Sequence, residues 1–493
     1  MFATDIRHLG GFLKGENGTK EQLEFSMIFY FLQEDVVMLG TATTFASEDR
    51  ITLEIAYDAH VNYNVLAGYG IWKQPCDGIG SKQCWFTMFF ATGARQLFPC
   101  LDEPRAKATF DMRVARTEGW NTLFNTPVLY TEPVQGLPGW VWDVFATTPA
   151  MSTYTMALAI QDFASILASN NMTIWAMESH IQAGYADYAA EVGPQCVSIT
   201  EKLYNTPYML PKMDMMHINN YGGAMENWGL IMYQFDYLLY DSSLPDPDYD
   251  RKWDVLETIA HELSHQWYGN LVTCAWFDQL WLNEGFATYV SHVVADIVDP
   301  TIHSWDRFIA VKMVYVMMLD SRKNAWALSD PMTSMADVDR KLGTISYWKG
   351  GAVIRMMESF LGVETFNKGL TNYLHDLSYQ TAEEEDLFLH LQEAGLEDGT
   401  WPQHYSIDGD QQVMEDFTQA MKTWTQQAGI PLLNLTIIGE DKVRISQAWY
   451  TNHGIIPGEK IWSIPVTIAD LGPEAENDWD DTSPDIWITQ VLI

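Results

Sequence analysis

The chain has 493 residues, of which 47% are hydrophobic and 13% aromatic, so it has enough apolar side chains for two to four domains with buried cores. Its 28 Lys and Arg face 65 Asp and Glu, and the formal net charge of -37 repels phosphates and anionic membrane surfaces, which excludes nucleic acid as a partner. No run of about 18 apolar residues occurs, and we therefore predict no transmembrane segment.

The first part of the chain is predicted to be an N-terminal β-sheet domain over residues 1–172. Short segments rich in β-branched and aromatic residues alternate there with turn residues, as in ITLEIAYDAHVNYNVLAG and WFTMFFATG. Cys76 and Cys84 bracket a loop that contains glycine and are candidates for a local disulfide, although five cysteines cannot all pair within one chain.

The pattern changes to helical periodicity over residues 173–430. Apolar residues recur three and four positions apart in VLETIAHELSHQWYGNL, FATYVSHVVADIV and GAVIRMMESFLG. After this helical domain, LLNLTII, KVRISQAWY and IWSIPVTIA alternate like strands and predict a small β domain over residues 431–493. The fold class expected from these segments is multidomain α+β.

The strongest chemical signal lies inside the first helical run, where His261, Glu262 and His265 form an HExxH motif. Positions four apart lie on one face of a helix, so both imidazoles can bind one metal ion. Glu262 lies beside them, where a carboxylate can take a proton from the attacking water. Glu284, in WLNEGFATYV, follows after 18 intervening residues, which is enough for a loop and a second helix to present it as the third ligand.

Two other interpretations of these residues remain open. His261 and His265 are also compatible with buried histidines in ordinary hydrogen bonds, with Glu284 as a surface carboxylate. Nitrogen and oxygen ligands with an open coordination position also suit divalent ions other than zinc. The three residues together favour one zinc ion per chain.

Three strings resemble a known family, the gluzincin aminopeptidases related to aminopeptidase N. They are GAMENWG at 223–229, AHELSHQWYGNLVT with WLNEGFATYV, and ISYWKGGAVIRM. The resemblance implies a thermolysin-like catalytic domain, a partial C-terminal β-sandwich and peptide substrates with a free N-terminus. It also implies that Glu226 binds the substrate amino group, which a carboxylate at the closed end of a cleft is able to do. Substrate contacts are implied for the rest of that string: Gly223, Ala224, Met225 and Asn227.

The resemblance assigns a further role to Tyr347, in ISYWKGG. Its hydroxyl is expected to stabilise the tetrahedral intermediate, because a donor aimed at a developing oxyanion contributes most in the transition state. The function that follows is a zinc-dependent aminopeptidase, with Glu262 and Tyr347 as its catalytic residues. A homodimer is left open.

The sequence departs from the family pattern at two positions and in length. Phe90 stands where the family has Gln or Glu, and an aromatic ring cannot accept a hydrogen bond from the substrate amine. Gln279 stands where the family usually has Asp, and we expect this change to weaken the support of the metal ligands slightly. The family generally continues into a helical C-terminal domain, so the last β domain is expected to be truncated.

Two other functions share these motifs. One is a cell-surface receptor or binding protein that retains the zinc site without strong catalysis, which the intact Glu262 and Tyr347 argue against. The other is the leukotriene-hydrolase branch of the same family, for which no residue gives specific support. Family resemblance and the sequons at Asn17, Asn171 and Asn434 favour an extracellular or cell-surface location, while the absence of a signal sequence or anchor leaves a cytoplasmic one open.

Overall fold

The structure is a computed structural model of the chain. It describes residues 4–14, 20–23, 25–31, 36–47, 49–59, 61–62, 70–76, 82–243, 249–332, 335–407, 410–439, 442–469 and 481–489. Among these residues, no helix combines the length and the apolar character that crossing a membrane requires. The sequon at Asn17 lies outside the described residues, whereas Asn171 and Asn434 are both exposed.

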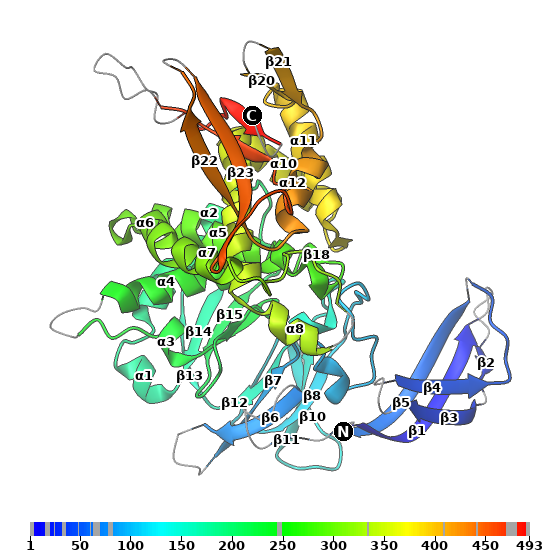
Figure 1. The fold of residues 1–493 in the computed structure, drawn as a ribbon. Helices are drawn as coiled ribbons and strands as arrows, with labels where there is room; N and C mark the ends of the chain where they lie inside the picture. The colour runs from blue at the N-terminus through cyan, green and yellow to red at the C-terminus, as the bar shows by residue number, and fades with distance from the viewer. Residues whose placement is uncertain are drawn as a thin grey trace.

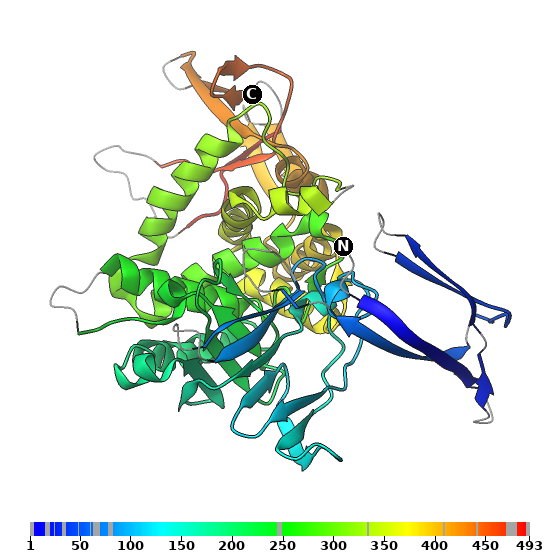
Figure 2. The same ribbon diagram turned by 90° about the horizontal axis from the view of Figure 1, so that it is seen from below.

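Extended strands at the N-terminus stand beside the rest of the molecule in both views (Figures 1 and 2). They form a three-stranded sheet in the order β2-β1-β5 and a separate β3-β4 hairpin. Their bounds are β1 (Thr4–Lys14), β2 (Lys20–Gln22), β3 (Phe25–Phe31), β4 (Val36–Thr41) and β5 (Arg50–Ala59).

Two more antiparallel sheets complete the N-terminal β region, in the orders β6-β7-β12-β9 and β10-β11-β8. A disulfide between Cys76 and Cys84 joins the end of β6 to β7, with an S–S distance of 2.06 Å. The strands are β6 (Gly70–Pro75), β7 (Gln83–Met88), β8 (Arg113–Thr117), β9 (Asn121–Phe124), β10 (Val128–Pro133), β11 (Trp140–Phe145) and β12 (Leu158–Gln161).

A five-stranded sheet then supports the helical part, in the order β13-β14-β15-β17-β16. β14, β15 and β17 run parallel, and every residue of β15 and β17 is buried, as in a sheet that is covered on both faces. The bounds are β13 (Ala164–Leu167), β14 (Met172–Ala176), β15 (Met213–His217), β16 (Ala224–Met225) and β17 (Leu230–Tyr233). The boundary at residue 172 stays a prediction, and β13 pairs with β14 across it.

The helices surround α5, which is buried along most of its length, including polar residues such as Glu284 and His292. α4 and α9 both pack on it. The α-helices are α1 (Glu178–Gln182), α2 (Asp187–Leu203), α3 (Phe235–Leu238), α4 (Tyr249–Ser264), α5 (Trp281–Val298), α6 (Ser304–Arg307), α7 (Val314–Asp320), α8 (Met335–Lys341), α9 (Gly350–Leu361), α10 (Val363–Asp376), α11 (Glu384–Asp398) and α12 (Phe417–Thr425). The π-helices are η6 (Phe308–Met313) and η7 (Ile345–Lys349), and the 3-10 helices are η2 (Ala94–Gln96), η3 (Thr153–Thr155), η4 (Phe277–Gln279) and η5 (Pro300–Ile302).

Strands return at the C-terminal end, as the sequence predicts. A small hydrophobic core of Trp449, Trp462, Ile464 and Ile488 lies among the strands after residue 430. A larger core extends from Trp72 to Trp487 and includes Tyr405 and Met414 of the hairpin at residues 403–414. The strands are β20 (Gln403–Ile407), β21 (Asp410–Met414), β22 (Ile430–Ile437), β23 (Val443–Thr451), β24 (Gly454–Ile456), β25 (Ile464–Val466) and β26 (Ile486–Ile488). The short parallel pair β18 (Thr273–Cys274) and β19 (Thr381–Ala382) connects the loop after α4 to the start of α11.

Candidate active site

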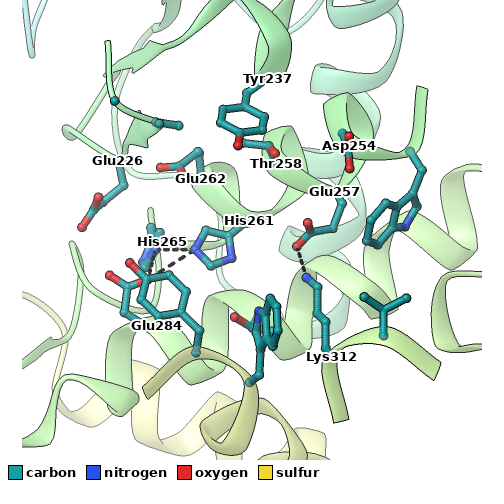
Figure 3. Close-up of a pocket in the computed structure, with 18 residues that line it drawn as sticks. Glu226, Tyr237, Asp254, Glu257, Thr258, His261, Glu262, His265, Glu284 and Lys312 are labelled. Atoms are coloured by element: carbon teal, nitrogen blue, oxygen red, sulfur yellow. Dashed lines mark hydrogen bonds and ion pairs between the residues drawn. The ribbon is translucent and has the colours of Figure 1, made fainter. Parts of the chain in front are cut away.

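Three potential metal ligands converge between α4 and α5 (Figure 3). His261 Nε2 lies 3.1 Å from His265 Nε2. Glu284 Oε2 lies 3.3 Å from His261 Nε2 and 3.2 Å from His265 Nε2. All three side chains are buried, so the HExxH motif and the distant glutamate meet at one point as the sequence predicts.

The local chain conformation explains this convergence. The two histidines lie one helical turn apart at the end of α4, and Glu284 lies in the first turn of α5. Gly269 then turns the chain with φ +129, and a Cβ there would lie 3.1 Å from His265 Nδ1. This turn therefore requires glycine, both for the backbone angle and for the close approach to the imidazole.

The cluster fits a zinc ion. Ligands held about 2.0–2.1 Å from zinc in a tetrahedron are about 3.3 Å apart, which matches the distances between these three atoms. His265 Nδ1 lies 2.9 Å from the carbonyl oxygen of Tyr268 and donates to it, which directs the Nε2 lone pair toward the cluster. Burial lowers the pKa of His265, but the negative charges of Glu284, Glu226 and Glu262 raise it to about 10. The same negative charges favour the binding of a metal cation.

Glu262 is a buried carboxylate whose Oε2 has no hydrogen-bond partner among the described residues. Burial raises its pKa well above the usual range; the positive charge of His265 opposes this shift, and the nearby Glu226 and Glu284 add to it. A carboxyl group with a raised pKa holds a proton more readily near neutral pH, which suits general acid–base chemistry. It lies in the same cavity as the three ligands.

Glu226 enters this cavity from the end of β16 (Figure 3). Its Oε1 is buried and has no hydrogen-bond partner within the described part of the chain. Its backbone oxygen is held from two sides, because it accepts hydrogen bonds from Gln266 Nε2 at 3.2 Å and Asn270 Nδ2 at 2.8 Å. Burial raises the pKa of this carboxyl group.

The other residues of this string divide between the cavity and the core. Gly223 and Ala224 line the cavity with Glu226, whereas Met225 is buried in the hydrophobic core and Asn227 is fully buried. Successive residues of an extended chain point to opposite sides, which explains why Ala224 and Glu226 face the cavity whereas Met225 and Asn227 do not. Met225 therefore supports the loop by apolar packing, whereas the side-chain amide of Asn227 is buried without a hydrogen-bond partner among the described residues.

Tyr347 lies on the π-helix η7 and also lines the cavity. Its ring stacks on His261 with 5.7 Å between the centroids and an interplanar angle of 6°. Burial and the carboxylates of Glu284, Glu226 and Glu262 raise the pKa of its phenol well above the usual value, so it remains a neutral hydrogen-bond donor. π-Helical turns occur frequently at functional sites, and here the turn carries a residue of the cavity.

A glycine pair brings Tyr347 close to Glu284. A Cβ built on Gly285 would lie 3.0 Å from Gly350 Cα, and one on Gly350 would lie 3.0 Å from Gly285 Cα. Any larger side chain would separate α5 from the start of α9. Because Gly285 follows Glu284 and Gly350 follows Tyr347 by three positions, this contact sets the spacing between the metal ligand and the tyrosine.

The two positions that depart from the family pattern have other contacts. Phe90 is buried in an aromatic cluster, with ring centroids 5.5 Å from Tyr154 and 5.2 Å from Phe277. The Gln279 side-chain oxygen accepts a hydrogen bond of 2.6 Å from the Glu384 backbone. Gln279 therefore holds the start of α11, and the expected effect on the metal ligands has no support in this contact.

Sequence reasoning missed four residues of the site. Gln266 and Asn270 hold the Glu226 backbone, and both were visible in the family-like string AHELSHQWYGNLVT. Glu257 and Lys312 form an ion pair of 2.9 Å in the wall of the same cavity, which has a volume of about 440 Å³. The position of Glu257 one turn before His261 could have suggested that it faces the site, whereas nothing in the sequence pointed to Lys312.

Two imidazoles from one helix and a carboxylate from the next, with a glutamate between the imidazoles, define the metal centre of a gluzincin metallopeptidase. Two family profiles match the chain: the Peptidase M1 N-terminal domain at residues 12–155 and the Peptidase family M1 domain at residues 188–424. The chain belongs to peptidase family M1. Its sequence motifs resemble those of the family members related to aminopeptidase N. The predicted fold class, an N-terminal β domain followed by a mainly helical zinc catalytic domain and small C-terminal sheets, is confirmed.

Curated relatives extend the match over most of the chain. Aminopeptidase N of Homo sapiens is 35% identical over 408 residues, which cover 80% of this chain and 40% of the relative. Membrane alanyl aminopeptidase of Manduca sexta is 34% identical over 455 residues, 89% of this chain and 44% of the relative. Endoplasmic reticulum aminopeptidase 1 of Rattus norvegicus is 31% identical over 469 residues, 91% and 49%. The chain thus spans less than half the length of these relatives.

Proposed function

We propose that the chain is a zinc-dependent aminopeptidase that hydrolyses the first peptide bond of a peptide and releases the N-terminal residue. One observation carries this proposal: the buried carboxylate of Glu226, with Oε1 unpartnered among the described residues, shares a cavity with the three metal ligands. A buried carboxylate without a partner is costly unless a cation binds it. The ammonium group of a peptide N-terminus is such a cation, and its capture leaves one residue between the anchor and the metal.

Each residue of the cavity then has a role. Zinc on His261, His265 and Glu284 would supply a Lewis acid that polarises the scissile carbonyl and makes water easier to deprotonate. Glu262 takes the proton of the attacking water and delivers it to the leaving amine. Tyr347 donates a hydrogen bond to the developing oxyanion, and Glu226 holds the substrate ammonium group. Gly223 and Ala224 bind the substrate backbone, Met225 packs behind this loop, and the substrate contact predicted for Asn227 stays a prediction.

The test uses aminoacyl chromogenic substrates with and without a chelator. We expect release that the chelator abolishes and added zinc restores. Glu262→Gln should lower kcat by about 10²–10⁴-fold while the zinc content stays at one per chain, because only the proton transfer is lost. Glu226→Gln should mainly raise KM for the substrate amine. Stoichiometric zinc with no release above the level of Glu262→Gln would refute the aminopeptidase and favour a binding protein.

We further propose that the protein acts in the secretory pathway or at the cell surface. The names of two relatives point to a membrane and to the endoplasmic reticulum, and the sequon residues Asn171 and Asn434 are exposed. Expression through the secretory pathway should give a mobility shift that a glycosidase removes and that Asn171→Gln with Asn434→Gln reduces. A homodimer stays a prediction that sedimentation would test.

A further inference from the structure

A buried tyrosine of the N-terminal β region lies close to the metal centre. Tyr154 is on η3, inside the part of the chain that matches the Peptidase M1 N-terminal domain, whereas the metal ligands lie on α4 and α5. Its side chain is buried and lies outside the lining of the cavity. Any influence of Tyr154 on the metal must therefore pass through the residues that it contacts.

The hydroxyl group of Tyr154 makes one hydrogen bond to each of the two segments that carry metal ligands. It donates to the backbone oxygen of Gly269 at 2.9 Å, and it accepts from Asn283 Nδ2 at 3.2 Å. Gly269 lies in the turn that follows His265, and Asn283 directly precedes Glu284. One hydroxyl group thus connects the turn after α4 to the first turn of α5.

Both segments already hold their ligands through other hydrogen bonds. The turn after α4 orients His265, whose Nδ1 donates to the backbone oxygen of Tyr268. On α5, Asn283 Oδ1 accepts a 3.0 Å hydrogen bond from the backbone N–H of Cys274. Hydrogen bonds that hold the residues around a metal ligand fix the direction in which the ligand points. Tyr154 is bonded to both of these supports at once.

Aromatic packing holds the Tyr154 ring in place. Its centroid lies 5.5 Å from that of Phe90 at an interplanar angle of 84°, and 5.6 Å from that of Phe277 at 77°. Edge-to-face contacts of this kind restrict the orientation of a ring, so Phe90, which departs from the family pattern, supports Tyr154. Burial and then the charge of Glu226 raise the pKa of the phenol well above its usual value, so the hydroxyl group keeps the proton that it donates.

The N-terminal β region therefore contributes to the metal centre through one side chain. We infer that Tyr154 is a positioning residue of the zinc site, whose hydroxyl group fixes the distance between His265 and Glu284 by connecting the segments on which they lie. The inference rests on the proposed function only through the zinc ion, because it requires neither a peptide substrate nor a particular reaction.

Loss of this hydroxyl group would affect the two segments unequally. The Gly269 oxygen also accepts from Thr273 Oγ1 at 2.6 Å, so it keeps a partner. Asn283 Nδ2, in contrast, has its only hydrogen bond among the described residues with Tyr154. A buried amide without a partner is unfavourable, so we expect the start of α5 to shift and to move Glu284 with it.

The test is Tyr154→Phe, which removes the hydroxyl group and keeps the ring. We expect the zinc affinity, measured by competition with a chelator, to fall about 10–100-fold. Cobalt(II) bound in place of zinc should show a changed visible absorption spectrum, because its absorption bands depend on the geometry of the ligands. Zinc should also raise the Tm of the variant less than that of the wild type. A purely structural loss would instead lower the Tm of the metal-free and the zinc-loaded protein equally.

The matched control is Tyr405→Phe, which removes a hydroxyl group that hydrogen-bonds the Thr489 side chain on β20, in the C-terminal part of the chain. It should leave the zinc affinity and the cobalt spectrum unchanged. Asn283→Ala breaks the same connection at α5, so it should also weaken zinc binding and provides a second measurement if Tyr154→Phe does not fold. Wild-type zinc affinity with a wild-type cobalt spectrum in either folded variant would overturn the positioning role of Tyr154.

Failure of the proposed function would give a different result. If the wild-type chain binds zinc and loses affinity in Tyr154→Phe, but releases nothing from an alanyl chromogenic substrate, the aminopeptidase is refuted and the role of Tyr154 in the zinc site stands.

Discussion

Gly350→Ala is expected to impair catalysis without removing any group that takes part in it. The new Cβ would lie 3.0 Å from Gly285 Cα and 3.3 Å from Trp281 Cβ. Carbon atoms at van der Waals contact are about 3.5–4.0 Å apart, so the start of α9 would have to move from α5 by roughly 0.5–1 Å. This movement would change the distance between Tyr347 and Glu284, which lie on the two separated elements.

The expected loss follows from that displacement. A misplacement of about 1 Å can lower the rate by about 10²-fold, and overpacking of this kind destabilises a core by about 1–3 kcal/mol. We expect kcat for an aminoacyl chromogenic substrate to fall by about 10–100-fold, with a smaller change in KM and with zinc retained. Steady-state kinetics, zinc analysis and a thermal melt would measure these effects on one preparation.

A matched control replaces a glycine in open space. Gly399 ends α11 with φ +75, and a Cβ added there would meet no atom within 4 Å, so Gly399→Asn should keep full activity. Wild-type kcat in folded Gly350→Ala would refute the argument that the glycine contact sets the position of Tyr347. Loss of bound zinc in a folded Gly350→Ala would also contradict it, because the expected movement leaves His261 and His265 in place.

Two other substitutions test the supports of the cavity. Asn270→Ala removes the 2.8 Å hydrogen bond to the Glu226 backbone. We expect KM to rise several-fold while the zinc content and the Tm change little. An unchanged KM would contradict the claim that Asn270 holds Glu226 in position. Burial raises the pKa of Glu257, but Lys312, His292 and His261 lower it from 4.5 to about 2. A carboxyl group with a lowered pKa stabilises the fold above its unfolded pKa, and this contribution is lost as pH falls toward 2. Lys312→Met should weaken the stabilising contribution of the Glu257 carboxylate, so the urea midpoint of the variant should fall less steeply than that of the wild type as the pH is lowered from 4.5 to 2. Equal slopes of midpoint against pH in the two proteins would refute this stabilisation of Glu257 by Lys312.

The metal centre could be predicted from the sequence because its geometry is mostly local. His261 and His265 are related by one turn of a single helix, and helical periodicity is a strong signal. Glu284 needed only a loop and a second helix of sufficient length. For Glu226 the prediction relied on the family-like string, because no periodic pattern places a loop carboxylate beside a metal.

Other parts of the site depend on tertiary contacts that no local pattern encodes. Glu257 and Lys312 are separated by 55 positions and meet because the Lys312 side chain extends from η6 to α4. The contact of Gly285 with Gly350 likewise depends on the packing of α9 against α5, and no local pattern predicted the π-helical turn that contains Tyr347. The division of the loop at β16 could have been predicted from strand alternation, which separates Ala224 and Glu226 from Met225 and Asn227.

The electrostatics of the cavity give a reason why Glu226 Oε1 and Glu262 Oε2 have no hydrogen-bond partner among the described residues. Three buried glutamates, Glu226, Glu262 and Glu284, share it with two imidazoles, an arrangement that is unfavourable for a fold unless cations bind there. Each carboxylate has a different partner in the proposed reaction. Glu284 faces the metal, Glu226 faces the substrate ammonium group, and Glu262 faces the proton of the attacking water. The buried negative charge that destabilises the fold at this cavity is thus the same charge that would attract zinc and the substrate ammonium group in the proposed reaction. Locally unfavourable arrangements of this kind are expected at functional sites.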